Sequence, residues 1–136
     1  LKTREQLRKI FSASPFLPVS SIGVTETDKH FLQKLAAVTE ENLGDVDFNI
    51  DALASGMHMS RSSLNRKLRG VLDMTPNDYI RQERLRKAYR LLKEGHGSNE
   101  VCFVVGFNTP SYFARCFRQQ FGISPKDLQK SGSEGD

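Results

Sequence analysis

The sequence of residues 106–125 is GFNTPSYFARCFRQQFGISP, and it carries the clearest structural pattern in the chain. Its apolar side chains recur at helical spacing, as Phe113 and Phe117 show. Thr109-Pro110 and Ser124-Pro125 each place a hydroxyl side chain directly before a proline. This pairing is typical of a helix start, because proline at the first helical position loses no hydrogen bond and already has a suitable φ. The stretch therefore predicts one amphipathic helix from Pro110 and another from Pro125.

Part of this stretch has a counterpart earlier in the chain. Leu64-x-Arg66-x-Leu68 has the same form as Phe113-x-Arg115-x-Phe117, and each places an arginine on the solvent side between two core positions. A helix-turn-helix needs a small residue at the helix contact and a turn residue four positions later. Both copies supply them: Ala54 and His58 in the first, Cys102 and Gly106 in the second. The second copy has one extra residue between turn and helix, and the pair predicts two helix-turn-helix units.

The rest of the chain also predicts helices. Thr25 and Asp28 have the form of a capping box, and Thr75-Pro76 begins a long basic helix that Gly95 ends. No segment shows sustained two-residue alternation. We expect an all-α fold of about seven helices, with two helix-turn-helix subdomains joined by a long linker helix.

The expected domain boundaries follow from these signals. Residues 1–23 contain a Pro- and Ser-rich stretch and are expected to form an N-terminal tail and linker. The compact domain is expected at residues 24–130, with the first helix-turn-helix at about 50–69, the linker helix at about 76–94 and the second helix-turn-helix at about 99–120. Residues 131–136 are expected to form a disordered tail.

Positive charge is concentrated in one part of the chain. The net charge is +4 overall, but residues 61–93 hold ten Lys or Arg side chains against three Asp or Glu. Such a cluster suits a polyanion, because neutralising phosphates releases condensed counterions. A solvated helix face is the alternative explanation, and charge alone does not decide between the two.

The sequence also bears on location and cofactors. No apolar run approaches the roughly 20 residues needed to cross a bilayer, and residues 1–11 lack a signal-peptide pattern. The domain is therefore expected in the cytoplasm, without membrane contact of its own. Because the chain begins at Leu1 rather than Met, we expect a fragment, which leaves open a membrane anchor elsewhere in the full-length protein. Cys102 and Cys116 lack neighbouring ligands for a metal and predict buried thiols.

Residues 106–125 resemble the signature of the AraC/XylS transcriptional regulators: Gly-Phe, then Ser-Tyr-Phe, Arg, Phe, a basic residue, Gly and Pro. The resemblance extends over about residues 25–130 and includes Tyr79-Ile80-Arg81 and Arg84-Leu85. It implies a bilobal all-helical domain whose two recognition helices enter successive major grooves of DNA. His58 in place of the usual Gly, and Cys102 in place of Ala, depart from the family pattern. The final segment, residues 126–129, lacks the family's aromatic-Arg pair.

A finer resemblance is to the output domains of hybrid two-component regulators, which fuse sensor, kinase, receiver and DNA-binding module. Phe31-Leu32, Asp47-Phe48 and residues 59–62 carry it. This resemblance implies control of carbohydrate-use genes.

Candidate DNA-contacting residues lie on the outward faces of the two recognition helices. Asn can pair with adenine and Arg with guanine, while Pro and Ala offer only apolar contact. The expected base contacts are Ser62, Asn65 and Arg66 on the first helix, and Pro110, Ser111, Ala114 and Arg115 on the second. Hydroxyls at helix starts and flanking arginines suit phosphates. The expected phosphate contacts are Ser60, Arg61, Arg69, Thr109 and Arg118.

Other groups are assigned structural duties. We expect Arg81, Arg84 and Arg86 to pair with Asp78 or Glu83, and the aromatic residues of the second recognition helix region to pack in the core: Tyr112, Phe113, Phe117 and Phe121. The three histidines are scattered, so we expect no enzyme activity, and no cofactor or metal.

Double-stranded DNA is the expected partner. RNA polymerase is considered as another, together with homodimerisation through regions outside this chain. A nucleic-acid binder without sequence preference and a protein-docking helical domain remain the alternatives.

Overall fold

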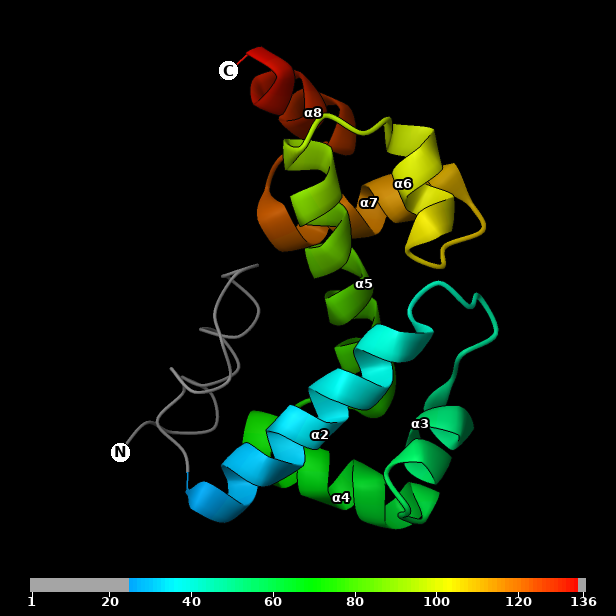
Figure 1. Ribbon diagram of the computed structural model, residues 1–136, viewed down its shortest axis with the longest axis vertical. Coiled ribbons are helices and arrows are strands. Elements are labelled where there is room, and N and C mark those ends of the chain that lie inside the picture. The colour runs from blue at the N-terminus through cyan, green and yellow to red at the C-terminus, as the bar shows by residue number, and fades with distance from the viewer. Residues whose placement is uncertain (1–24, 135–136) are drawn as a thin grey trace.

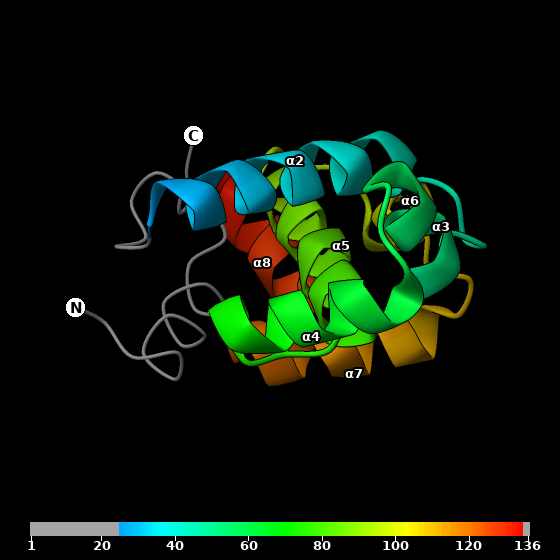
Figure 2. The same ribbon diagram turned by 90° about the horizontal axis from the view of Figure 1, so that it is seen from below.

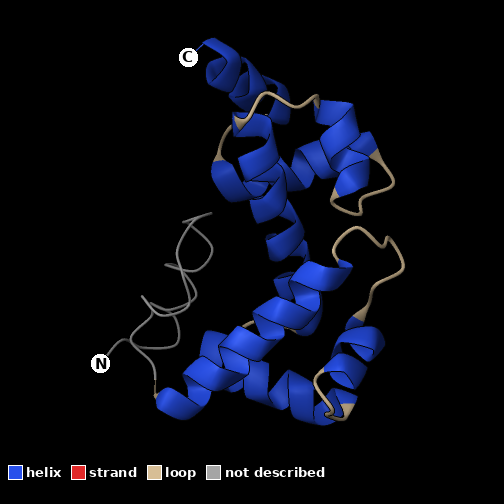
Figure 3. Ribbon diagram, viewed as in Figure 1, coloured by secondary structure: helices blue, strands red, loops and turns tan. Residues whose placement is uncertain are grey.

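The computed structural model describes residues 25–134, and every regular element in this range is a helix (Figure 3). The seven helices are α2 (Glu26–Asn42), α3 (Ile50–Gly56), α4 (Arg61–Leu72), α5 (Pro76–Lys93), α6 (Ser98–Val104), α7 (Pro110–Phe121) and α8 (Pro125–Glu134). The prediction of an all-α fold of about seven helices is confirmed. The predicted tail and linker at residues 1–23 lie outside the described residues.

The helices form two units that share α5 (Figure 1). In the first unit, α2, α3 and α4 pack around the N-terminal part of α5, and in the second, α6, α7 and α8 pack around its C-terminal part. Each unit has its own cluster of buried apolar side chains, and the two clusters have no residue in common. The predicted architecture of two subdomains joined by a long linker helix is therefore confirmed.

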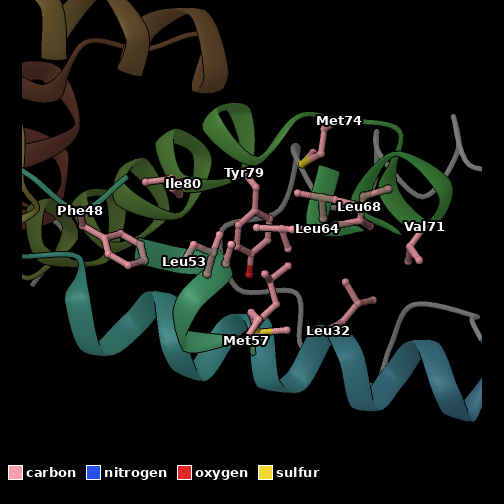
Figure 4. Packing of buried hydrophobic residues seen from close by; sticks show 13 residues of the cluster. Leu32, Phe48, Leu53, Met57, Leu64, Leu68, Val71, Met74, Tyr79 and Ile80 are labelled. Carbon is pink, nitrogen blue, oxygen red and sulfur yellow. The ribbon is translucent and has the colours of Figure 1, made fainter. Parts of the chain in front are cut away.

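Leucines from three helices and one tyrosine form the centre of the first cluster (Figure 4). Leu53 of α3 and Leu64 of α4 lie beside Tyr79 of α5, Leu32 of α2 belongs to the same cluster, and all are almost completely buried. Burying a leucine side chain contributes about 1.5–3 kcal/mol relative to leaving it exposed. The apolar face of α4 is therefore held against the core, and its opposite face is left for solvent or a partner.

Aromatic rings form the centre of the second cluster. The Phe113 and Phe117 rings of α7 are tilted with centroids 5.8 Å apart, and Phe117 lies 4.8 Å from Phe121. Tilted contacts at these separations are favourable for aromatic rings. Core packing of Phe113 and Phe117 is as predicted, and Phe121 is half-buried. Tyr112 differs from its prediction, because its side chain is 42% exposed.

Hydroxyl caps fix the starts of four helices. In each, the N–H of the third residue after the hydroxyl donates to its oxygen at 3.1–3.2 Å: Asp28 to Thr25, Ser63 to Ser60, Asp78 to Thr75 and Asp127 to Ser124. These bonds satisfy N–H groups that the helix itself leaves without a partner. The caps predicted at these four positions are confirmed.

Thr109 is an exception, and the hydroxyl cap predicted there is wrong. It is the N-cap residue of α7, but its side chain accepts no hydrogen bond from the helix. Its ψ is 109°, whereas ψ is 159° at the capping residues Ser60 and Thr75. Its hydroxyl lies instead 3.2 Å from Oδ1 of Asn108 and donates to it. The neighbouring amide therefore competes for the hydroxyl that the sequence assigned to the helix.

The C-terminal boundary also differs from the prediction. Helix α8 continues to Glu134, whereas the sequence placed the domain end at residue 130 and a disordered tail from residue 131. Residues 131–134 therefore have helical backbone, and the predicted boundary is wrong by four residues. The helix starting at Pro125 meets no proline and no left-handed residue that would end it at 130.

Candidate nucleic-acid interface

Helices α4 and α7 occupy equivalent places in the two units, and we call them the recognition helices. Each has 12 residues and follows a helix of 7 residues. Between the two helices of each unit lies a turn residue with positive φ, His58 (57°) or Gly106 (94°). Three positions separate His58 from the start of α4, and four separate Gly106 from the start of α7. The repeat and the extra residue in the second turn are as predicted, and His58, which stands in place of the family's usual Gly, has a left-handed φ.

The two recognition helices lie along the same side of the molecule. In Figure 2 both run along the lower side, while α2 lies along the opposite side. They are joined through α5, whose 18 residues correspond to a length of about 27 Å. This is of the order of one helical turn of DNA, about 34 Å. The arrangement leaves both recognition helices on one side of the molecule.

On α4, the predicted base-contacting residues Ser62, Asn65 and Arg66 are all exposed. Arg66 is the sixth residue of the helix and lies on the side opposite the buried Leu64 and Leu68. The structure therefore brings these three polar side chains together on one solvent-facing surface.

The residues predicted to contact phosphate from the first unit are also exposed, and two of them have partners. The Ser60 hydroxyl caps α4 and lies 3.0 Å from the Ser63 hydroxyl. Arg61 lies 3.6 Å from Asp51 of α3, in a pair of largely exposed side chains. Such exposed pairs contribute little, so the pair with Asp51 holds Arg61 only weakly. Arg69 makes no ion pair among the residues described.

On α7, Pro110, Ser111 and Arg115 are exposed, whereas Ala114 is half-buried. Arg115 is the sixth residue of α7, which matches the place of Arg66 in α4. Its guanidinium lies 5.3 Å from the centre of the Tyr112 ring, within the range of a cation–π contact. The exposed ring of Tyr112 therefore supports the arginine on the recognition surface.

The other residues predicted to contact DNA from α7 are exposed, and one further residue lies beside them. Thr109 and Arg118 are exposed near the start and the last turn of the helix. Gln119, which the sequence analysis did not select, is exposed one turn after Arg115 and so lies on the same face. Its spacing of four residues from Arg115 was the signal available in the sequence.

A groove of about 320 Å³ lies at the junction of the two units, between the starts of α5 and α7. Its polar lining comes from both units and from α5: Asn49, Asn77, Arg81, Asn108 and Tyr112. Arg81 lies 2.7 Å from Asp78, so the pair predicted for these two residues is confirmed. Burial raises the pKa of Asp78, but hydrogen bonds from Arg81 and Thr75 outweigh this effect and leave the pKa below its ordinary value.

The other two arginines of the linker helix have different partners. Arg86 lies 3.4 Å from Glu83, as predicted, and both side chains are largely buried. Burial raises the pKa of Glu83, while the nearby Arg86 opposes that rise. Among the described residues, no ion pair joins Arg84 to Asp78 or Glu83, so the pairing predicted for it is wrong. It donates instead to four backbone carbonyl oxygens.

Other kinds of site find no support in residues 25–134. No helix in this range is both long and apolar enough to span a bilayer. The same residues contain no group of three or more His, Cys, Asp or Glu side chains placed to hold a metal ion. Cys102 and Cys116 are free, buried thiols, as predicted.

Comparison with known proteins places this arrangement in a family. The sequence matches the helix-turn-helix domain family over residues 53–131. Histidine kinase P4 of Formosa agariphila is 30% identical over 135 residues, which cover 98% of this chain and 10% of that protein. The chain spans 10% to 34% of the length of the first curated relatives it matches.

Two solved structures are similar at the level of the fold. The C-terminal domain of the two-component response regulator yesN from Fusobacterium nucleatum has a TM-score of 0.65 and 25% identity, covering 74% of this chain and 98% of that one. The DNA-binding domain of AdpA, solved in complex with a target DNA, has a TM-score of 0.67 and 28% identity, covering 76% of this chain and 94% of that one.

The fold and the paired recognition helices define a tandem helix-turn-helix domain. The family match covers more than half of the chain, which belongs to the AraC-type helix-turn-helix DNA-binding domains of transcriptional regulators. The match to the Formosa histidine kinase covers only 10% of that protein, so its name alone assigns no activity to this chain.

Proposed function

We propose that this domain binds double-stranded DNA sequence-specifically, with α4 and α7 in successive major grooves. The observation that carries the proposal is the placement of both recognition helices along one side of the molecule, with Arg66 and Arg115 at the same position in each (Figure 2). A major groove admits one α-helix, and successive grooves on one face of DNA recur every helical turn. Two helices on one side, joined through an 18-residue helix, suit that repeat.

The exposed side chains of each helix suit distinct parts of the DNA. Arg66 and Arg115 can each pair with guanine, and Asn65 can pair with adenine. Ser62 and Ser111 can donate to or accept from base edges, while Pro110 and Ala114 offer apolar contact to a thymine methyl group. Gln119 adds an amide that can pair with adenine.

Phosphate contacts are proposed for the residues that flank these positions. Arg61, Arg69 and Arg118 supply positive charge, and Ser60 and Thr109 lie at helix starts, where N–H groups and the helix dipole favour anions. The absence of a side-chain cap at Thr109 leaves the N–H groups of the first turn of α7 available to a phosphate. Contacts of this kind position the protein without selecting a sequence.

We further propose that the domain is the output module of a two-component sensor-regulator that controls carbohydrate-use genes. The alignment of nearly the whole chain with a segment of a histidine kinase supports the first part of this proposal, and the response-regulator domain of the same fold adds to it. The proposed control of carbohydrate-use genes rests on the resemblance to output domains of hybrid two-component regulators. Phe31-Leu32, Asp47-Phe48 and residues 59–62 carry that resemblance. RNA polymerase and a second copy of the full-length protein are proposed partners.

Selection of bound sites from a random DNA pool tests the function. We expect a recurrent sequence with two half-sites about 10 bp apart. Arg66→Ala and Arg115→Ala should each weaken binding to that sequence by about 1–3 kcal/mol and reduce the preference over random DNA. Arg90→Ala is the matched control, because Arg90 pairs loosely with Glu40 of α2, on the side away from the recognition helices.

The alternatives give different results in the same experiment. A binder without sequence preference would show equal, salt-dependent affinity for selected and random DNA. A protein-docking domain would bind neither. If Arg66→Ala and Arg115→Ala both leave binding to the selected sequence unchanged at the same salt concentration, the assignment of α4 and α7 as recognition helices is wrong.

A further inference from the structure

Arg84 connects the two units through its side chain. It lies in the middle of α5, is 6% exposed, and donates to four backbone carbonyl oxygens. Its Nη1 lies 2.6 Å from the oxygen of Leu43 and 2.9 Å from that of Val105. Its Nη2 lies 3.0 Å from the oxygen of Asp45 and 3.3 Å from that of Phe48. Val105 belongs to the second unit and the other three to the first, so one side chain binds both.

Two of these oxygens belong to helix C-termini. Leu43 is the C-cap of α2, and Val105 is the C-cap of α6. Carbonyl groups at helix C-termini lack partners within the helix and carry partial negative charge. A guanidinium is always charged, and its rigid planar fork presents donors in several directions. Arg84 therefore joins the negative ends of two helices, one from each unit.

Gly106, the turn residue of the second unit, leaves the space that this contact needs. A Cβ atom at Gly106 would lie 1.4 Å from Nη1 of Arg84 and 2.3 Å from the oxygen of Leu43. Both distances are far below any possible contact, so a side chain at this position would displace Arg84 or the end of α2. The turn residue of the first unit is His58, which carries a side chain and also has a positive φ, at 57°. The glycine is therefore needed for the approach of Arg84 as well as for its own φ.

Most buried apolar side chains of the two units lie in separate clusters. Their buried clusters share no residue. The groove of about 320 Å³ opens at the junction and is lined by Arg84 and Gly106 themselves. A junction with a groove beside it leaves room for the units to shift, unless polar contacts hold them. The hydrogen bonds of Arg84 supply such contacts.

We propose that Arg84 is a positioning residue that fixes the separation and orientation of the two recognition helices, and so makes the domain selective for the spacing between two DNA half-sites. This inference rests on the proposed function, since spacing has meaning only where both helices contact DNA. Each base pair inserted between half-sites rotates one relative to the other by about 34°. A domain with a rigid junction cannot adjust its two recognition helices to such a rotation and loses affinity. A domain with a loose junction can adjust them and keeps its affinity.

The test measures affinity against a series of DNAs built from the selected site. The series has 1, 2 or 5 bp inserted between the half-sites, and two further DNAs have one half-site scrambled. Arg84→Met removes the charge and the donors at similar side-chain length, and Arg84→Lys keeps the charge without the fork. Lys93→Met is the matched control, because it removes a charge from an exposed position of the same helix. Circular dichroism reports whether each variant is folded.

We expect the wild type to lose about tenfold or more in affinity when 2 bp are inserted, because both helices then cannot dock at once. Arg84→Met should bind each single half-site within about twofold of the wild type, while its affinity at the native spacing falls about tenfold and its spacing profile flattens. Arg84→Lys should give an intermediate profile, and Lys93→Met the wild-type profile. If Arg84→Met keeps the wild-type profile, the role of Arg84 is refuted and the proposed function stands.

Two further outcomes are informative. If neither Arg84 variant folds, the wild-type profile decides: equal affinity for all spacings refutes a rigid junction, and a steep profile supports it. If the wild type selects no sequence at all, the proposed function itself is refuted.

Discussion

Replacing Gly106 by alanine is expected to destabilise the domain more than the same change at any open glycine. Its φ of +94° is a conformation that costs an alanine about 1–2 kcal/mol. The added Cβ would also lie 1.4 Å from Nη1 of Arg84, which must then move away from its carbonyl partners. Losing a hydrogen bond made by a charged, buried group costs about 1.5–3 kcal/mol. The free energy of unfolding should therefore fall by about 2.5–5 kcal/mol for Gly106→Ala.

Gly122→Ala provides the matched control for this measurement. Gly122 also has positive φ, at +75°, but a Cβ there would meet nothing within 4 Å. This variant should therefore lose only the backbone contribution, about 1–2 kcal/mol. Urea unfolding followed by circular dichroism gives both values under the same conditions. If the two variants differ by less than about 0.5 kcal/mol, the contact between Gly106 and Arg84 has no energetic weight and the reasoning fails.

Three smaller perturbations test other features. Ser60→Ala should lower the free energy of unfolding by about 1 kcal/mol, because it removes a helix cap. Thr109→Ala should lower it by only a few tenths of a kcal/mol, because the Thr109 hydroxyl does not cap α7. Equal losses for the two variants would contradict the structure. Asp78→Asn should cost about 0.5–1 kcal/mol at pH 7. Arg81 helps to hold the pKa of Asp78 below its ordinary value, so this stabilisation is present above pH 3.8 and is lost as the pH falls below it. The free energies of unfolding of the wild type and Asp78→Asn, measured by urea titration, should therefore become equal near pH 2. Cys102 should react with a thiol reagent only on unfolding, since burial raises its pKa; rapid reaction of the folded domain would argue against that burial.

Features that depend on neighbouring residues could be predicted from the sequence. The hydroxyl-proline starts at Thr75 and Ser124, and the matched arginines of the two recognition helices, depend on spacings of a few residues. Local patterns of that kind determine helix starts and helix faces. The cap at Thr109 failed for a reason equally local, the competing amide of Asn108, which a pattern of hydroxyl before proline does not include.

The partners of Arg84 could not have been predicted in the same way. They lie 41, 39, 36 and 21 residues away, and all are backbone oxygens, which carry no sequence identity. The composition of the linker helix favoured carboxylate partners, and that reasoning was right for Arg81 and Arg86. It was wrong for the arginine at the junction, where tertiary structure brings backbone oxygens, two of them at helix ends, within hydrogen-bond distance of the guanidinium.

The order of the two units in one chain gives the domain a polarity. Symmetric repressor dimers have a two-fold axis and bind palindromic sites, which look alike from either direction. Here one unit follows the other, its turn is one residue longer, and its recognition helix carries different side chains. No rotation exchanges the two halves. Bound as proposed, the domain therefore has one orientation on its DNA site. Any segment that precedes α2 then lies toward the same end of every site that the domain occupies.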